Sequence, residues 1–412
     1  MLDQTIRTHV FENGLTLLLE PMPDVQSAAF TVLVPAGSIY DPPHGNGTST
    51  LLCEMMSRGA GDRDSRQLSA ALDTLGVQRS EGSGPSHMSF SGATLGDNLI
   101  DTLTLYADIL LRPQLPEDEF EAAKASVEQT LRSTEDEPRQ KLLQELRRKT
   151  YPAPWGLPSD GSLDDLPNIT PEWVRRHYDR CFRPNNTIVA IAGRFNPKLI
   201  QAQIEDLLGG WHIAPQLDVP IGESVPVFEH IEHESTQTHI GISYPSVPYN
   251  HPDYFAAWAA VSVLSGGSSS RLFTEVREKR GLCYSVSASL STLKHDGRVM
   301  CYAGTTAERA QETLDVTVAE LRRIAEGIQE DELDRCKARA KSSLIMAQES
   351  TSSRSSSMAS DWHHLGRVTT LDEIRDRIEA LTVDTVLDYV HRYPANNLTI
   401  LTLGPERLKM PS

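Results

Sequence analysis

Cysteine is rare in this chain of 412 residues, and no two cysteines have the C-x-x-C spacing of a zinc ribbon or a dithiol redox motif. The five are widely scattered, and their odd number does not suit a complete disulfide framework: Cys53, Cys181, Cys283, Cys301 and Cys336. We therefore expect reduced, mostly buried thiols. Such use of cysteine favours a cytoplasmic protein.

Basic residues are also few, because 39 Lys and Arg stand against 56 Asp and Glu, a formal net charge of −17. Binding to the phosphates of nucleic acids depends on basic surface, so this balance argues against a general nucleic-acid-binding protein. No apolar run approaches the roughly 18 residues of a membrane span. Residues 1–11 show neither a signal peptide nor a transit peptide, although a chain whose leader had been removed would look the same.

The sequence instead contains a long internal repeat, with a period near 211 residues. The stretch NNTIVAIAG from Asn185 resembles NNLTILTLG from Asn396, 211 residues later. Two further pairs match in the same order: PEDEFEAAKASVEQTL with QEDELDRCKARAKSSL, and YDPP with YNHP. Three matches at nearly one offset indicate one fold used twice.

Strand-like and helix-like segments alternate within each half. Asn13-Gly14 between apolar runs predicts a hairpin with a type I′ turn, 28–34 a buried strand, and 48–58 a helix. We expect an α+β protein of two homologous domains, each a mixed β-sheet covered by helices mainly on one face. The Pro-containing stretch 215–225 would be the linker between domains 1–214 and 226–412.

The helix at 48–58 carries the first candidate site. Leu51, Leu52, Met55 and Met56 form an apolar face, which we expect in the core. Thr50, Cys53, Glu54 and Ser57 form a polar face. Cys53 and Glu54 are adjacent and project about 100° apart, so the pattern favours a solvated or cleft-facing side over a metal site.

Three longer stretches resemble the pitrilysin-type metallopeptidases, the inverted-zincin family, and within it the branch of mitochondrial processing peptidase and its bacterial relatives. They are HVFENGLTLLLEP, VPAGSIYDPPHGNGTSTLLCEMMSRGA and SGGSSSRLFTEVREKRGLCYSVSA. The resemblance covers essentially the whole chain and implies the duplicated fold, as half of a clam-shaped dimer. Family members carry H-x-x-E-H, two zinc ligands with a general base between them, and a further glutamate that completes the zinc shell.

In this chain the resemblance places Thr50 at the first histidine, Cys53 at the base and Glu54 at the second histidine. Thr130 falls at the distal ligand, 76 residues after Glu54. All four positions are therefore substituted, and zinc catalysis needs three protein ligands and a base. We expect no catalytic residue and no metal on this chain.

The second half keeps an Arg and a Tyr seven residues apart, Arg277 and Tyr284, which the resemblance implies reach the substrate. Their N–H and O–H donors suit a peptide carbonyl or an oxyanion. Alternatively, Arg277 forms a surface ion pair with a neighbouring glutamate and Tyr284 is core. Gly266 and Gly267 precede this segment; they lack the P-loop pattern and favour a hinge or substrate-adjacent loop over a phosphate cradle.

Two histidine pairs could be mistaken for metal ligands. His230 and His233 lie at a strand entry, where residues three apart face opposite sides. His363 and His364 are adjacent on a helix and diverge. We expect all four to be surface or core residues.

The leading hypothesis is a non-catalytic, substrate-binding subunit of a heterodimeric zinc endopeptidase, in which a homologous partner carries H-x-x-E-H and the zinc. One alternative is an inactive homodimer that binds peptides or acts as a scaffold. Another is an active enzyme with a metal site rebuilt around Cys53 and Glu54.

Overall fold

The computed structural model describes residues 4–411, in which helices and strands interleave as expected for an α+β protein. The chain forms two compact units, each built around its own sheet. Unit 1 consists of Met1–Ser133, Leu157–Pro220 and Ile345–Thr370, and unit 2 consists of Thr134–Gly156, Ile221–Leu344 and Leu371–Ser412.

The sheet of unit 1 has six strands in the order β1-β2-β8-β3-β7-β6. Its strands are β1 (Arg7–Val10), β2 (Thr16–Pro21), β3 (Ser27–Val34), β6 (Gln78–Ser83), β7 (Met88–Leu95) and β8 (Ile188–Gly193). β2 and β8 run parallel, and all other neighbours run antiparallel. β8 is buried along its whole length, since it lies inside the sheet between β2 and β3 and α11 packs on it.

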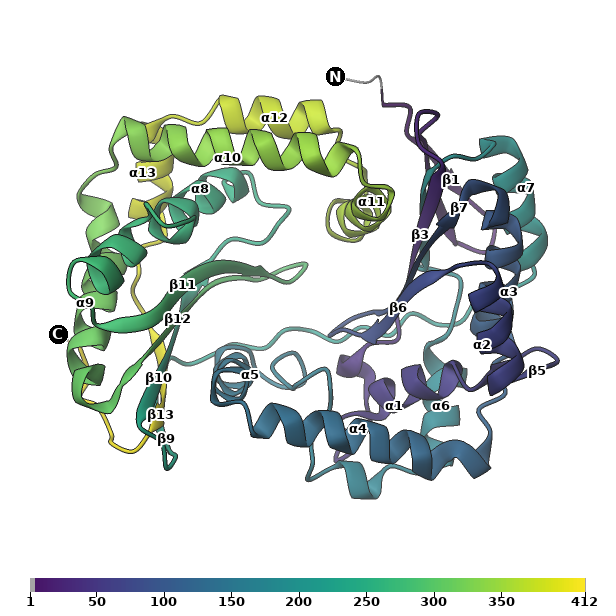
Figure 1. Cartoon of the computed structure of the whole chain (residues 1–412), viewed down its shortest axis with the longest axis horizontal. Helices are drawn as coiled ribbons and strands as arrows, with labels where there is room; N and C mark the ends of the chain where they lie inside the picture. Colours follow the sequence, from purple (N-terminus) through teal and green to yellow (C-terminus); the bar gives the residue numbers. More distant parts are fainter. Residues whose placement is uncertain (1–3, 412) are drawn as a thin grey trace. The chain divides into compact units, whose positions relative to one another are not determined.

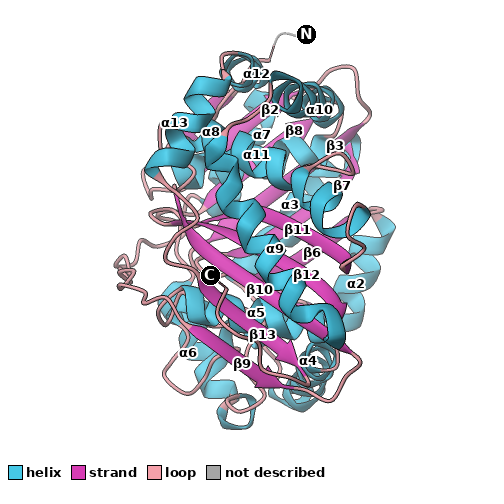
Figure 2. Cartoon of the chain, turned by 90° about the vertical axis from the view of Figure 1, so that its left-hand side faces the viewer, coloured by secondary structure: helices cyan, strands magenta, loops and turns pink. Residues whose placement is uncertain are grey.

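The sheet of unit 2 has five strands in the order β11-β12-β10-β13-β9 (Figure 2). Its strands are β9 (Phe228–Glu232), β10 (Gln237–Ser246), β11 (Cys283–Thr292), β12 (Gly297–Thr306) and β13 (Thr399–Gly404). Strand for strand this order repeats β6-β7-β3-β8-β2, with the single parallel pair in the same place. The internal repeat read from the sequence is therefore a repeat of topology, with β1 added to unit 1.

A backbone detail supports the repeat. Asn186 and Asn397, 211 residues apart, both adopt positive φ angles, 68° and 52°, just before β8 and β13. Asparagine is among the few residues that tolerate this left-handed conformation. The turn that leads into the strand was thus kept in both copies.

The helices follow the same repeat. In the first half of the chain they are α1 (Thr48–Met56), α2 (Ser65–Thr74), α3 (Leu99–Leu111), α4 (Phe120–Glu135), α5 (Pro138–Thr150), α6 (Pro171–Cys181) and α7 (Pro197–Leu208). In the second half they are α8 (Tyr254–Ser265), η5 (Phe273–Glu278), α9 (Ala310–Arg323), α10 (Glu330–Gln348), α11 (Thr351–Leu365), α12 (Leu371–Glu379) and α13 (Val383–Arg392).

Two helices at matching places in the repeat are exchanged between the halves. α5, from the first half of the sequence, packs on β10 and β13 in unit 2, and α11, from the second half, packs on β3 and β8 in unit 1. In unit 2, α5 lies on the face of the sheet opposite α9 (Figure 1). In unit 1, α11 lies on the face of the sheet opposite α3 and α7. The compact units therefore differ from a simple division into 1–214 and 226–412, whereas 211–227 does lack helix and strand.

The serine-rich sequence of α11 explains how it approaches the sheet. Small side chains let Met358 and Ala359 pack fully buried on β8, while Ser355 and Thr31 share a hydrogen bond of 3.1 Å. Arg354, 1% exposed, donates to the carboxylate of Glu20 at 2.8 Å. Removing one partner of such a buried pair costs about 3–5 kcal/mol, so this contact fixes α11 firmly.

α5 uses a different solution in unit 2. Leu142 and Leu146, both fully buried, pack against Leu401 and Leu403 of β13. Gly241 of β10 faces Leu146, and a β-carbon there would lie 3.0 Å from its Cδ2. The glycine therefore makes room for the leucine.

The hairpin at Asn13-Gly14 forms, but its turn differs from the predicted type I′ turn. Val10 pairs with Thr16, so the loop has five residues rather than two. Of this pair only Gly14 has a positive φ, 81°, and the Asn13 amide donates to the Leu208 carbonyl at 2.9 Å. Its Oδ1 accepts a hydrogen bond from the Leu15 N–H at 3.2 Å, so Asn13 holds the loop and also joins it to the end of α7.

The five cysteines are all buried and free, as expected. Within residues 4–411, no helix is long and apolar enough to cross a membrane.

Candidate functional site

α1 is held at its start by a buried carboxylate. Asp41 accepts hydrogen bonds from the N–H groups of Gly47 and Ser49, at 2.9 and 2.8 Å. Burial raises the pKa of Asp41 to about 7, against the effect of these donors. The predicted apolar face is confirmed, because the four residues Leu51, Leu52, Met55 and Met56 are at most 2% exposed.

The polar face of α1 borders a cavity of about 280 Å³ in unit 1. β6, the edge strand of the sheet, and α4 supply its other walls. The cavity is lined by Thr50, Cys53, Glu54, Ser57, Glu81, Gly82, Ser83, Ser126, Val127, Thr130 and Asp160. The structure thus brings together the four positions that the sequence resemblance had assigned, including Thr130 from a separate helix.

The donors around this cavity do not fit zinc. Glu54 is engaged by Arg58 at 2.8 Å, and Arg58 also reaches Glu119 at 3.2 Å. Burial, with the charges of Glu81 and Glu54 adding to it, raises the pKa of Cys53 to about 12, so the thiolate that zinc requires is disfavoured.

The two threonines complete this picture. Thr50 donates to the Ser159 carbonyl at 2.7 Å, and Thr130 donates to the Ser126 carbonyl at 3.2 Å. Zinc prefers thiolate, imidazole and carboxylate ligands, and a threonine hydroxyl is none of these. Among residues 4–411, no cluster of three or more His, Cys, Asp or Glu side chains is placed to hold a metal ion.

Sequence reasoning missed several residues of this site. Arg58 lies four residues after Glu54 on a helix, a spacing that could have revealed the ion pair. Glu119, Glu81 and Asp160 carry no such signal, because they come from distant segments. Tyr106 supports Glu81 from the core, since its hydroxyl donates to the Glu81 carboxylate at 2.8 Å.

Arg277 and Tyr284 lie on adjoining elements of unit 2, η5 and β11, which pack against each other. Tyr284 is 62% exposed, at an irregularity in the pairing of β11 with β12, and so it is not a core residue. Arg277 is exposed, and its guanidinium lies 4.8 Å from the ring centre of Phe273.

The expected alternative for Arg277, an ion pair with Glu275 or Glu278, is absent from the described part of the chain. Glu275 is instead paired with Lys279 at 2.7 Å and with Arg280 at 2.8 Å. Both Arg277 and Tyr284 therefore present free donors at the surface of the unit, while their neighbours are committed to each other.

The remaining candidates are placed as follows. Gly266 and Gly267 form the loop after α8 and border a second, smaller cavity. His230 lies on β9 and is 2.8 Å from the Thr402 hydroxyl, and the ring of His363 on α11 packs edge-on against His87. His230 and His363 thus make contacts within their own units.

Comparison with protein families assigns both halves of the chain. Residues 16–158 match the model described as insulinase (peptidase family M16), and residues 168–340 match the model described as the peptidase M16 inactive domain. The chain belongs to the M16 peptidase family.

Individual relatives agree with this assignment along the full length. A Bacillus subtilis protein named uncharacterized zinc protease YmxG is 27% identical, over 99% of this chain and 100% of its own. An uncharacterized zinc protease of Rickettsia felis is 24% identical, over 97% of each chain.

Two solved structures share the fold. A peptidase M16 inactive domain from Pseudomonas fluorescens superposes with a TM-score of 0.91 at 22% identity, covering 99% of both chains. A protease from Helicobacter pylori superposes with a TM-score of 0.89 at 20% identity, covering 97% of this chain and 99% of its own. The predicted two-domain α+β architecture is confirmed.

Proposed function

We propose that this chain is a non-catalytic subunit that binds peptide substrate and completes the active site of a homologous, zinc-carrying partner for peptide-bond hydrolysis. The observation that carries the proposal is the contrast between its two candidate sites. The cavity at Thr50, Cys53, Glu54 and Thr130 lacks a ligand set for zinc, whereas Arg277 and Tyr284 are exposed and form no side-chain hydrogen bond or ion pair with residues 4–411.

The chemistry of these two side chains suits a role across an interface. A guanidinium and a phenol can both donate hydrogen bonds to a peptide carbonyl, and more strongly to the oxyanion that develops during hydrolysis. Arg277 stacks on Phe273, which limits the freedom of the guanidinium before it meets a substrate. Zinc on the partner would polarise the scissile carbonyl and activate water.

The test is to mix or co-express the chain with a homologue that carries H-x-x-E-H and to follow cleavage of a fluorogenic peptide. We expect no activity from the chain alone, and a co-eluting complex whose activity exceeds that of the partner alone and is lost with a chelator. Arg277→Ala and Tyr284→Phe should each lower kcat by about 100-fold, the effect of losing one oxyanion donor.

The matched control is Arg280→Ala, because Arg280 ends the same segment but is paired with Glu275. It should leave the activity of the complex unchanged. Hydrolysis by the chain alone would contradict the non-catalytic assignment. A stable self-dimer that ignores the partner would replace the proposal with the scaffold alternative.

A further inference from the structure

A cavity of about 110 Å³ lies in unit 2 between the end of α8, the loop 266–270 and α10. This volume is several times the roughly 30 Å³ that one water molecule occupies in the liquid. Its lining is mainly polar, with Ser262, Ser269 and Ser270 on one side and Arg335 and Arg339 of α10 on the other. It belongs to a different unit from the cavity at α1.

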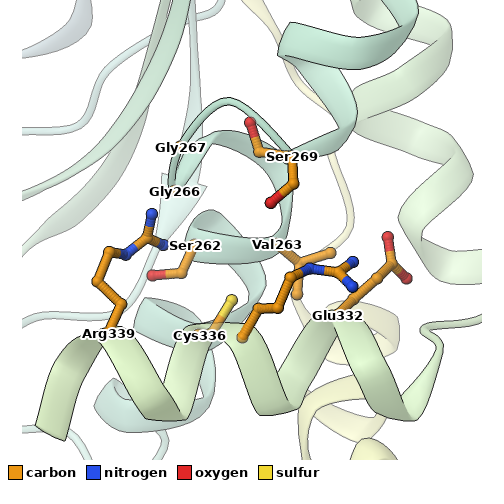
Figure 3. A pocket seen from close by; sticks show the side chains of 10 residues that line it. Ser262, Val263, Gly266, Gly267, Ser269, Glu332, Cys336 and Arg339 are labelled. Atoms are coloured by element: carbon orange, nitrogen blue, oxygen red, sulfur yellow. The ribbon is translucent and has the colours of Figure 1, made fainter.

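Arg339 is the central feature of this cavity. Figure 3 shows its side chain rising from α10 to the turn at Gly266 and Gly267. A β-carbon at Gly266 would collide with its Nη2, and one at Gly267 would lie 2.7 Å from its Nη1. The two glycines therefore allow the guanidinium to lie directly against the loop.

The guanidinium of Arg339 has no hydrogen bond or ion pair with any residue in 4–411, although the chain has more acids than bases. Glu332 is the one acid that lines the cavity, and Arg271 binds it through two bonds of 2.7 and 2.6 Å. Arg335 forms an ion pair of 2.5 Å with the exposed Asp331. Arg339 is exposed to solvent, and its positive charge thus has no free counter-charge among the residues that line the cavity.

We infer that this cavity binds a small oxyanion, a carboxylate or a phosphate, with Arg339 as its principal ligand and the serine hydroxyls as further donors. The planar fork of an arginine matches the oxygen spacing of both anions. Ser269 lies on the loop and Arg339 on α10, and both line the cavity, so an anion bound there would meet donors from two elements (Figure 3). In a P-loop the glycines and the basic residue lie in one short stretch of sequence. Here the basic residue, Arg339, lies on a helix some 70 residues after the glycines, so that spacing is absent.

The test uses the intact chain and titrates it at constant ionic strength with inorganic phosphate, with N-acetylglycine and with N-acetylglycinamide. We expect saturable binding that Arg339→Gln weakens by about tenfold, the scale of one charge-assisted contact. Ser269→Ala should weaken binding by about threefold, as for a neutral hydrogen bond. Circular dichroism would check that each variant is folded.

The control is Lys341→Gln, which removes the same charge from the same helix, where Lys341 pairs with Glu379 at 3.1 Å. It should change the affinity by less than about twofold, since exposed pairs contribute little. Binding of phosphate alone assigns the site to phosphate groups. Binding of N-acetylglycine but not of its amide assigns it to carboxylates such as a peptide C-terminus. Absence of saturable binding, or equal affinity in wild type and Arg339→Gln, overturns the inference.

Discussion

α1 and α8 occupy the same place in the two repeats but differ in how polar their surfaces are. α1 follows β3 and packs against α6 and β6, and α8 follows the matching strand β10 and packs against the matching elements α13 and β11. α1 keeps a polar side that borders a cavity, whereas α8 buries seven apolar residues. The cavity beside α8 is confined to the end of that helix, at Ser262 and Val263, whereas the one beside α1 follows the helix from Thr50 to Ser57. The fold therefore does not require a polar cavity along the middle of this helix, and the one at α1 needs a separate reason.

The proposed function offers a reason. The cavity lies where the sequence resemblance places a zinc site, with all four positions replaced. Its surviving polar groups are bound to each other and to the backbone, as Glu54 is to Arg58 and Thr50 to Ser159. The polar side of α1 is thus held in place by local hydrogen bonds and one ion-pair network.

The largest expected effect is a gain of zinc binding. Combining Thr50→His, Cys53→Glu, Glu54→His and Thr130→Glu restores the family pattern on a backbone that already gathers these positions. We expect the variant to bind about one zinc per chain, because three protein ligands and a second-shell carboxylate suffice. Metal analysis after dialysis measures this.

The matched control for this gain keeps Thr130 and changes only the three positions on α1. It should bind zinc more weakly, since it lacks the distal ligand. A folded four-position variant without zinc would show that the assigned register of α1 or α4 is wrong.

The next effect concerns Cys53, which borders the cavity but is 8% exposed. With its pKa raised to about 12 by burial, the thiolate fraction at pH 8 is about 10⁻⁴. Native protein should therefore be alkylated at Cys53 at least about 100-fold more slowly than urea-unfolded protein, with the rate rising with pH. Rapid labelling of Cys53 at pH 8, located by mass spectrometry, would contradict this.

The smallest effects compare the two helices directly. Thr50→Ala removes one hydrogen bond at the cavity and should lower the free energy of unfolding by about 1 kcal/mol. Ala257→Asn on α8 places an amide in a fully buried site and should cost about 2 kcal/mol or more. Urea unfolding measures both. Equal costs would mean that the polar side of α1 is as tightly packed as α8.

Much of the fold could be read from the sequence because its signals are local. The stretches at Asn185 and Asn396 revealed the duplication, and 28–34 and 48–58 were close to β3 and α1 as observed. The apolar face of α1 followed from helical spacing alone. The turn type at Asn13-Gly14 was wrong, since the loop has five residues and its Asn13 side chain also bonds to a carbonyl nearly 200 residues away, a contact that local sequence does not reveal.

By itself the sequence determined two similar α+β halves, and its resemblance to a family led to the predictions that the zinc ligands are replaced and that Arg277 and Tyr284 are retained. Only the tertiary structure decided that α5 and α11 exchange units, that Arg58 holds Glu54, and that Arg339 meets the Gly266 loop. The physical reason is the distance along the sequence over which each kind of interaction acts. Periodicity and turn chemistry act over a few residues, whereas these contacts join segments whose proximity depends on how whole elements pack.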